Sequence, residues 1–322
     1  MVNRKIVVLG SIAYDFIMNF NGDMNQMIST DPENKVFNLA VMPETKIKSF
    51  GGTAGNIGYN LSLLSAHAGI ITSVGQDFIE LGYQDRIQNF PNISFEGKIH
   101  ADSHSASCYI VNDHTKNQLI IFHRGAMVRG EEISIKDKYT NSEEIKIASI
   151  SPDYSPAMIK WGNEFHEMKI PFLFDPGQVT PEFTAEGLND LIPKSFLLIG
   201  NEYEISMICE KLGVTVQQLL ELNPNVIITK GAQGSECHFQ GETYNIPVCN
   251  PSAVKDPTGA GDGFRAGLLL GLANDLAFEI ACKLGSVVGS FVVETPGPQS
   301  QQFSIESVKD RFSENYHETL SM

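Results

Sequence analysis

Short runs of apolar residues recur along the chain, and segments with helical periodicity separate most of them. We predict strands at residues 6–9, 70–74, 145–150, 172–174, 196–199 and 226–229. We predict a helix at residues 54–66, because Ile57, Leu61 and Leu64 fall on one stripe of a helical surface. Strands that are apolar throughout and alternate with helices are typical of a parallel sheet covered on both faces. The pattern therefore predicts an α/β fold.

Two segments depart from this alternation. Residues 16–50 mix polar and apolar positions and contain no clear helix, and residues 105–122 have the pattern of a hairpin with a turn at residues 112–117. We predict that the two segments pair as a small β-sheet lid, and ordinary surface decoration is the alternative. The predicted division is a large domain of residues 1–15, 51–104 and 125–322 and a lid of residues 16–50 and 105–124.

Composition narrows the classes of partner. The chain has 38 acidic and 23 basic residues and a net charge of -15, which argues against nucleic acid as a partner but allows a small phosphorylated ligand. The five cysteines are scattered and form no Cys-x-x-Cys pair, which fits a reducing compartment and predicts neither a disulfide framework nor a metal site. No apolar run approaches the roughly 20 residues of a membrane span. We therefore expect a cytoplasmic protein that does not bind membranes.

The most informative stretch is residues 256–267, a glycine-rich turn that leads into an apolar helix. Gly259 and Gly261 let backbone N–H groups approach an anion closely, and a helix N-terminus attracts phosphate. Asp262 lies in the same turn, where a carboxylate would repel an anion. We therefore interpret Asp262 as a base for an incoming hydroxyl group rather than as a helix cap. The stretch matches neither the P-loop pattern nor the dinucleotide-binding fingerprint.

Polar residues and glycines also gather near the first strand and the first helix. Gly51 and Gly52 open the helix predicted at residues 54–66, and Asn56 lies on its first turns. An amide both donates and accepts hydrogen bonds, which suits the vicinal hydroxyls of a sugar. A helix entry with glycines for packing is the alternative. Asp15 follows the first strand, where ligands collect in α/β sheets, although an aspartate there can also serve a turn or a cap.

Two later strands end in turns with candidate binding groups. Asn201 and Glu204 lie three positions apart on one helical face, where they could orient water around Mg²⁺, or Asn201 could only cap the helix. Thr229, Gly231 and Gly234 form a glycine turn that could hold the phosphate or ribose of a nucleotide. A simple hairpin is the alternative for this turn.

These segments, in this order, resemble the ribokinase-like (PfkB) carbohydrate kinase family over essentially the whole chain. The region of Gly51, Gly52 and Asn56 is similar to the family's N-terminal signature. Residues 256–262 are similar to its C-terminal signature, and residues 201–204 to its Asn-x-x-Glu motif. Within the family the chain looks most like bacterial adenosine and other nucleoside kinases, on residues 10–15, 50–57, 174–178 and 265–268.

The resemblance implies a ribokinase-like fold and transfer of the γ-phosphoryl group of MgATP to the 5′-hydroxyl of a nucleoside, with adenosine preferred, as in purine salvage. Asp262 would accept the hydroxyl proton, and N–H groups of Gly259, Ala260 and Gly261 would stabilise the transferring phosphoryl group. The resemblance implies that ribose binds to Asp15, Gly51, Gly52 and Asn56, and that Asn201 and Glu204 hold Mg²⁺ through water. It implies that ATP binds to Asn201, Thr229, Gly231, Gly234, Gly259 and Gly261. A monovalent cation such as K⁺ would bind at Asp256, Thr258, Val292 and Gly297.

The lid would recognise the base. Tyr109 and Phe122 are candidates for stacking on it, with packing inside the lid as the alternative, and Gln118 could bond a purine edge or face solvent. The resemblance also implies a homodimer formed through the lid. Two further hypotheses are a sugar kinase of the same family, acting on ribose or a related furanose, and a non-catalytic nucleoside sensor.

Overall fold

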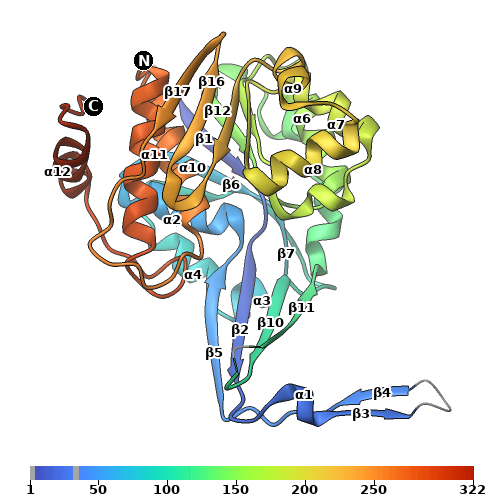
Figure 1. The fold of residues 1–322 in the computed structure, drawn as a ribbon. Helices are drawn as coiled ribbons and strands as arrows, with labels where there is room; N and C mark the ends of the chain where they lie inside the picture. Colours follow the sequence, from blue (N-terminus) through green and yellow to red (C-terminus); the bar gives the residue numbers. More distant parts are fainter. Residues whose placement is uncertain (1–3, 32–35, 116) are drawn as a thin grey trace.

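The computed structural model describes residues 4–31, 36–115 and 117–322, so residues 32–35 of the predicted lid and residue 116 of its predicted turn lie outside the described residues. A nine-stranded sheet runs through the molecule in the order β17-β16-β15-β14-β13-β12-β1-β6-β8 (Figure 1). The strands from β15 to β8 are parallel, and β16 and β17 extend the sheet in antiparallel fashion. Their bounds are β1 Lys5–Leu9, β6 Ala68–Ile71, β8 Ile93–Phe95, β12 Ile145–Ile150, β13 Phe172–Phe174, β14 Leu197–Asn201, β15 Val226–Thr229, β16 Ser235–Phe239 and β17 Glu242–Ile246.

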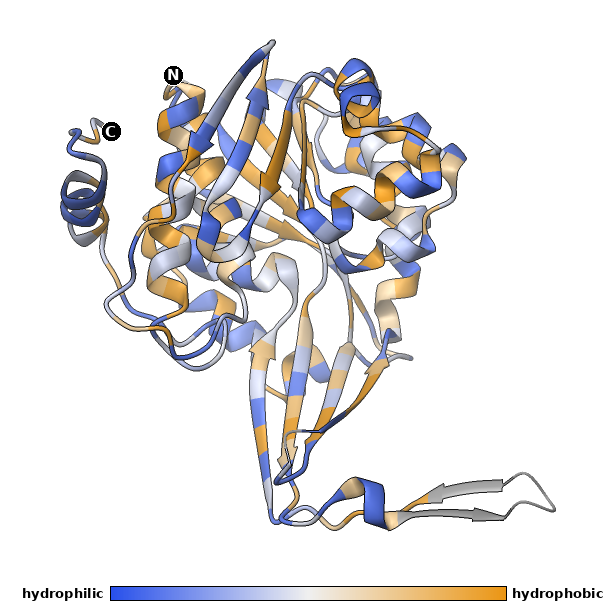
Figure 2. Ribbon diagram, viewed as in Figure 1, coloured by the Kyte–Doolittle hydropathy of each residue, from blue (hydrophilic) through white to orange (hydrophobic). Residues whose placement is uncertain are grey.

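Helices cover both faces of this sheet, as the α/β prediction requires (Figure 1). The apolar run of strand β1 is continuous because both of its faces are buried. Ile6 and Val8 belong to the core beneath α2 (Thr53–Leu63), α10 (Ala260–Ala273) and α11 (Phe278–Val292), whereas Val7 and Leu9 belong to the core beneath α6 (Ser155–Glu167). Full burial of one such side chain contributes about 1.5–3 kcal/mol, so both faces of the strand stabilise the sheet. Figure 2 shows strands of the main sheet that are largely apolar and outer helices in which apolar and polar residues are mixed.

The helices vary in length, and the longest pack against the main sheet. Their bounds are α1 Met24–Met27, α2 Thr53–Leu63, α3 Asp77–Glu80, α4 Tyr83–Gln88, α5 Ile135–Lys138, α6 Ser155–Glu167, α7 Ala185–Leu191, α8 Glu202–Leu212, α9 Val216–Leu222, α10 Ala260–Ala273, α11 Phe278–Val292 and α12 Ile305–Tyr316. Short 3₁₀ helices lie at η1 Gly125–Glu132, η2 Ser142–Glu144, η3 Gly177–Glu182, η4 Ile192–Lys194 and η5 Gly231–Gln233. Within the described ranges, none of these helices has the length and apolar character needed to cross a bilayer.

One predicted strand is wrong in its extent. The chain leaves the main sheet after β6, and β7 (Ser73–Gly75) pairs instead with β9 (Lys98–His100) in a separate two-stranded sheet. The side chain of Thr72, at the break, is fully buried and donates a hydrogen bond to Asp153 Oδ2 at 3.1 Å. The carbonyl of Thr72 accepts from the N–H group of Lys98 at 2.9 Å. Both bonds direct the chain out of the main sheet at this residue.

A four-stranded sheet projects from the carboxyl edge of the main sheet, in the order β11-β10-β2-β5 (Figure 1). It contains β2 (Ala13–Asn19), β5 (Thr45–Gly51), β10 (Ala106–Asn112) and β11 (Gln118–His123). The pairing of β10 with β11 confirms the predicted hairpin. A second hairpin, of β3 (Ile28–Asp31) and β4 (Val36–Leu39), branches between β2 and β5 at the far end (Figure 1). The small separate sheet is confirmed, and the domain limits stay a prediction.

Candidate active site

The carboxyl ends of the parallel strands and the base of the four-stranded sheet meet at one edge of the main sheet. Asn56 on α2 and Asp262 on α10 come together here from positions 206 residues apart in the chain. Asn56 Nδ2 donates a hydrogen bond to Asp262 Oδ2 at 2.8 Å. This contact joins the two motifs that the sequence placed on the sugar side and on the phosphate side of the site.

The glycine-rich turn at the start of α10 depends on Gly259. Its φ of 82° is left-handed, and a Cβ atom there would lie 2.6 Å from Pro298 Cβ, so glycine is required on both counts. The first N–H groups of a helix have no acceptor within the helix and can bind an anion. Of the three predicted donors, Ala260 is engaged within the turn, because its N–H donates to the carbonyl of Pro257 at 3.2 Å. Gly261 lies in the first turn of the helix and remains a candidate donor.

Asp262 lies in a half-buried and strongly charged environment. Burial raises the pKa of Asp262 to about 7, although the positive charge of Arg265 and the hydrogen bond from Asn56 act to lower it. Arg265 lies one turn further along α10 and forms a buried ion pair with Asp175, which follows β13. Arg265 also donates to the carbonyl of Gly261 at 2.9 Å. A carboxyl that titrates near neutrality is suited to act as a base at physiological pH.

The opposite side of the site is formed by β2 and the start of α2. Burial raises the pKa of Asp15, on β2, to about 6. A Cβ atom on Gly51 would overlap the carboxylate of Asp15, and one on Gly52 would lie 2.5 Å from the carbonyl oxygen of Ser11. Gly52 also has a left-handed φ of 86°. Gly51 thus keeps space beside the Asp15 carboxylate, whereas Gly52 lets the chain pass close to the backbone of residues 11–13. The space beside Asp15 suits a ligand with neighbouring hydroxyl groups.

Two residues that the sequence analysis missed complete this side of the site. The hydroxyl of Tyr83, on α4, donates to the carbonyl of Gly51 at 2.8 Å. Gln299 Nε2 donates to the Tyr83 hydroxyl at 2.7 Å and to Asn56 Oδ1 at 2.9 Å. Tyr83 is fully buried, and both Asp15 and Asp262 raise its pKa further by their negative charge, after burial itself. Neither residue lies in a motif, so no local signal could have found them.

Asn201 and Glu204 form a reciprocal cap at the start of α8. Glu204 N donates to Asn201 Oδ1 at 2.9 Å, and Asn201 N donates to Glu204 Oε2 at 2.8 Å. The cap that the sequence analysis left as an alternative is therefore present. Glu204 uses Oε2 in this cap, so Oε1 is the oxygen that would hold the water shell of Mg²⁺, which keeps much of its hydration in proteins. The pair fits a water-mediated magnesium site.

The predicted nucleotide turn lies beside this cap. Strand pairing puts Thr229 in register with Asn201. Gly231 and Gly234 follow in left-handed backbone conformations, with φ of 55° and 88°. The structure thus brings the three turn residues to the same strand ends as the predicted magnesium pair.

Three members of the predicted monovalent-cation site, Asp256, Thr258 and Gly297, also come together. Asp256 Oδ1 accepts from Thr258 N at 2.9 Å, and Asp256 Oδ2 accepts from Gly297 N at 2.9 Å. Although burial acts to raise the pKa of Asp256, these hydrogen bonds hold it below its usual value. Asp256 therefore ties two loops together, and its assignment to a cation stays a prediction.

Two predicted base-binding residues need correction. Side chains in register across a sheet share a face and alternate along each strand, so Asp15, Cys108 and Phe122 share one face. Tyr109 points to the other face, where its ring stacks on Phe16 at 5.1 Å. Gln118 pairs with Asn112 at the far end of the sheet and donates to it at 2.9 Å. Only Phe122, which is half exposed, keeps a position compatible with base stacking.

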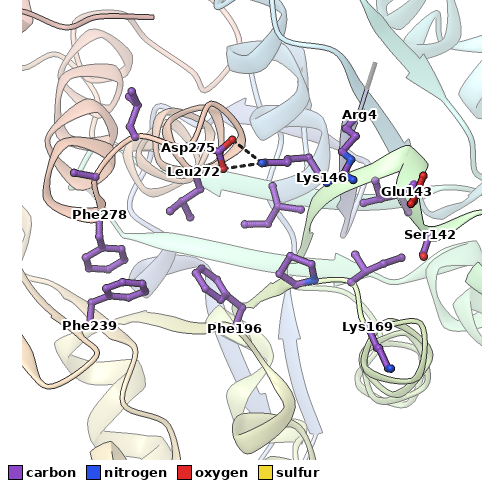
Figure 3. Close-up of a pocket in the computed structure, with 16 residues that line it drawn as sticks. Arg4, Ser142, Glu143, Lys146, Lys169, Phe196, Phe239, Leu272, Asp275 and Phe278 are labelled. Carbon is purple, nitrogen blue, oxygen red and sulfur yellow. Dashed lines mark hydrogen bonds and ion pairs between the residues drawn. The ribbon is translucent and has the colours of Figure 1, made fainter. Parts of the chain in front are cut away.

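A hollow of about 640 Å³ lies at the opposite edge of the main sheet, among the amino ends of β12 and β14 (Figure 3). Phe239 and Phe278 stack at one side of it, and Lys146 binds Asp275 above it. Because the predicted site residues lie at the carboxyl edge, this hollow is separate from the candidate active site.

A carboxyl that titrates near neutrality beside a glycine-rich helix N-terminus is compatible with a phosphotransferase that has an alcohol acceptor. The chain matches the pfkB family carbohydrate kinase model over residues 3–304 and belongs to that family. The family and its relatives identify the protein as a nucleoside or sugar kinase.

Two nucleoside kinases illustrate this relationship. The nucleoside kinase of Methanocaldococcus jannaschii is 28% identical over 97% of this chain and 98% of its own length. Its structure superimposes with a TM-score of 0.85 and covers 97% of this chain and 98% of that chain. The nucleoside kinase of Burkholderia thailandensis in complex with inosine is 30% identical, with a TM-score of 0.83, and the match covers 98% of this chain and 100% of that chain.

Proposed function

We propose that the protein transfers the γ-phosphoryl group of MgATP to the 5′-hydroxyl of a nucleoside, with adenosine as the preferred substrate. The observation that carries the proposal is the hydrogen bond from Asn56 to Asp262, because it joins a sugar-binding motif to a phosphate-binding turn. The similarity to nucleoside kinases over nearly the whole chain, one of them in complex with inosine, supports a nucleoside rather than a free sugar.

In the proposed reaction the 5′-oxygen of the nucleoside lies against the carboxylate of Asp262. A bond forms between this oxygen and the γ-phosphorus, and the bond from the γ-phosphorus to the bridging oxygen of ADP breaks. The hydroxyl proton passes to Asp262, and ADP leaves. N–H groups of the turn at Gly259 and Gly261 stabilise charge on the transferring group, which is the main demand of phosphoryl transfer.

The other predicted residues would position the two substrates. Asp15 and Asn56 would bind the ribose hydroxyls beside Gly51 and Gly52, and Phe122 would stack on the base. Mg²⁺ would neutralise the phosphate charge, held through water by Asn201 and Glu204. Thr229, Gly231 and Gly234 would line the ATP site. A monovalent cation such as K⁺ would bind near Asp256, Thr258, Val292 and Gly297.

We also infer a homodimer through the lid. Strand β11 lies at an edge of the four-stranded sheet, and Ile120, Ile121 and Phe122 on it are about half exposed. An exposed apolar edge strand invites pairing with a second chain. Sedimentation velocity of the wild-type protein tests this inference, which predicts a dimer.

A substrate panel tests the proposed function. ADP release is measured with MgATP and adenosine, inosine, guanosine, cytidine, ribose or fructose. The proposal predicts saturable turnover with nucleosides and the highest kcat/KM with adenosine. Saturable activity on free sugars alone would establish the sugar-kinase alternative. Tight nucleoside binding without phosphorylation of any compound would establish the sensor alternative.

A further inference from the structure

A chain of hydrogen bonds runs from Arg86, on α4, to the carboxylate of Asp262. Arg86 Nε donates to Gln299 Oε1 at 2.9 Å. Gln299 Nε2 donates to Asn56 Oδ1 at 2.9 Å, and Asn56 Nδ2 donates to Asp262 Oδ2 at 2.8 Å. The side chains of Asn56 and Gln299 are buried, so water competes little for these bonds.

The guanidinium group determines the direction of this chain, because it can only donate hydrogen bonds. It requires the oxygen of the Gln299 amide on its side and thereby turns Nε2 toward Asn56. Because Gln299 Nε2 is a donor, Asn56 must accept through Oδ1, and its NH₂ group therefore faces Asp262. Reversal of either amide would place a buried donor against a donor or a buried acceptor against an acceptor, which costs the hydrogen bond.

Gln299 serves a second branch with the same direction. Its Nε2 atom also donates to the hydroxyl of Tyr83, and that hydroxyl donates to the carbonyl of Gly51. Arg86 itself is held in place, with the guanidinium 4.9 Å from the ring centre of Phe50 and 5.2 Å from that of Tyr59. The amide of Gln299 therefore contacts both branches, the one that ends at the carbonyl of Gly51 and the one that ends at the carboxylate of Asp262.

We propose that Gln299 is a positioning residue whose amide, oriented by Arg86, makes Asn56 present its NH₂ group rather than its oxygen to the carboxylate of Asp262. The inference rests on the proposed function, in which this carboxylate is the base. A donor stabilises the ionised carboxylate that accepts the proton, whereas an oxygen in its place would favour the protonated, inactive form.

Substitution at residue 299 leaves the other ionisable groups around Asp262 in place. These are Arg265 on the same helix, Asp175 after β13, Glu204 on α8 and Tyr83 on α4. A change in the ionisation of Asp262 can therefore be assigned to the side chain at residue 299, and Gln299→Leu, which adds no charge, separates loss of the amide from the added charge of a glutamate.

The variant Gln299→Glu tests the direction of the chain. Glutamate has nearly the same shape and still accepts from Arg86, but it replaces the Nε2 donor with an oxygen. We expect kcat/KM for adenosine to fall about tenfold or more and the acidic limb of its pH profile to move up by about one pH unit, because the ionised base loses a hydrogen bond. The melting temperature should stay near that of the wild type, since the glutamate gains an ion pair with Arg86.

Gln302→Glu is the matched control. Gln302 lies three positions further along the same segment and also donates to a tyrosine hydroxyl, that of Tyr59, at 2.8 Å, but it is not part of the chain to Asp262. Its kinetics and pH profile should match those of the wild type. Gln299→Leu is a second test variant. Leucine neither forces the Asn56 amide to reverse nor holds it in place, so kcat/KM of this variant should lie between those of the wild type and Gln299→Glu.

A purely structural role predicts the opposite order, since glutamate preserves the bond to Arg86 and leucine removes it. Wild-type kcat/KM and pH profile in Gln299→Glu would overturn the proposal, as would higher activity in Gln299→Glu than in Gln299→Leu. If Gln299→Glu does not fold, Arg86→Met replaces it, because it frees the Gln299 amide to reverse; an unchanged pH profile in that variant would overturn the proposal. Failure of the proposed function is distinguishable, because the wild type itself would then not phosphorylate adenosine.

Discussion

Replacement of Asp262 with asparagine tests the base and its electrostatic environment in one variant. Asparagine keeps the size of the side chain, and its oxygen can still accept the hydrogen bond that Asn56 donates to Asp262. The amide cannot accept the proton of the substrate hydroxyl. We therefore expect kcat to fall by roughly 10²–10⁴-fold, the usual contribution of a general base. The KM for MgATP should change little, because the backbone donors of the turn are retained.

The same substitution should stabilise the fold above neutral pH. Burial raises the pKa of Asp262 from 3.8 to about 7, so between these values the folded protein binds the proton more tightly than the unfolded chain. The free energy of unfolding of the wild type therefore falls as pH rises through this interval. A shift of this size corresponds to at most about 4 kcal/mol above pH 7. Because Asp262 is only partly shielded from solvent, we expect a gain of about 1–2 kcal/mol in the variant.

Two measurements check this reasoning. ADP release gives kcat, and thermal unfolding at pH 5 and pH 8 gives the change in stability, expected as a rise in Tm of roughly 2–4 °C at pH 8 and a smaller rise at pH 5. Asp310→Asn is the control, since Asp310 is exposed on α12, and it should match the wild type in both assays. Turnover of Asp262→Asn within threefold of the wild type would refute the role as base. A loss of stability at pH 8 would refute the burial argument.

Four further substitutions test the remaining assignments. Phe122→Ala should raise the KM for adenosine about tenfold through loss of stacking, whereas Tyr109→Ala should leave it unchanged; equal effects would refute the assignment of the lid faces. Asn201→Ala removes a helix cap, and it should lower the free energy of unfolding in urea by about 1 kcal/mol and raise the Mg²⁺ concentration for half-maximal activity. An unchanged magnesium titration would limit Asn201 to capping. Gly51→Ala places a methyl group on the Asp15 carboxylate, and nucleoside affinity measured by calorimetry should fall more than tenfold; wild-type affinity would contradict the ribose assignment.

The main sheet was predictable because each buried strand carries its own signal. Strand β1 is apolar at every central position, since its two faces enter different cores. The break at Thr72 was not predictable, because its cause is a hydrogen bond to Asp153, 81 positions away in the chain. Local patterns record burial, but they do not record which distant partner a buried polar group finds.

The same distinction separates the site residues. Asp262 and Asn56 were predictable because each lies in a local motif at the start of a helix. The choice between Tyr109 and Phe122 was not, because it depends on the register of β10 with β2 rather than on either strand alone. Gln299 carries no local signal, since its role consists of bonds to residues more than 200 positions away.

The charges around Asp262 explain how a carboxylate can lie beside an anion site. Arg265 is committed to its ion pair with Asp175, so Asp262 and Glu204 remain as negative charges near the turn. The start of α10 offsets only about half a charge. In the proposed reaction ATP would arrive with Mg²⁺, whose charge would offset part of the negative charge of the triphosphate. A carboxyl with a pKa of about 7 is partly protonated at neutral pH, so the burial that suits Asp262 to act as a base also reduces its repulsion of the phosphoryl donor.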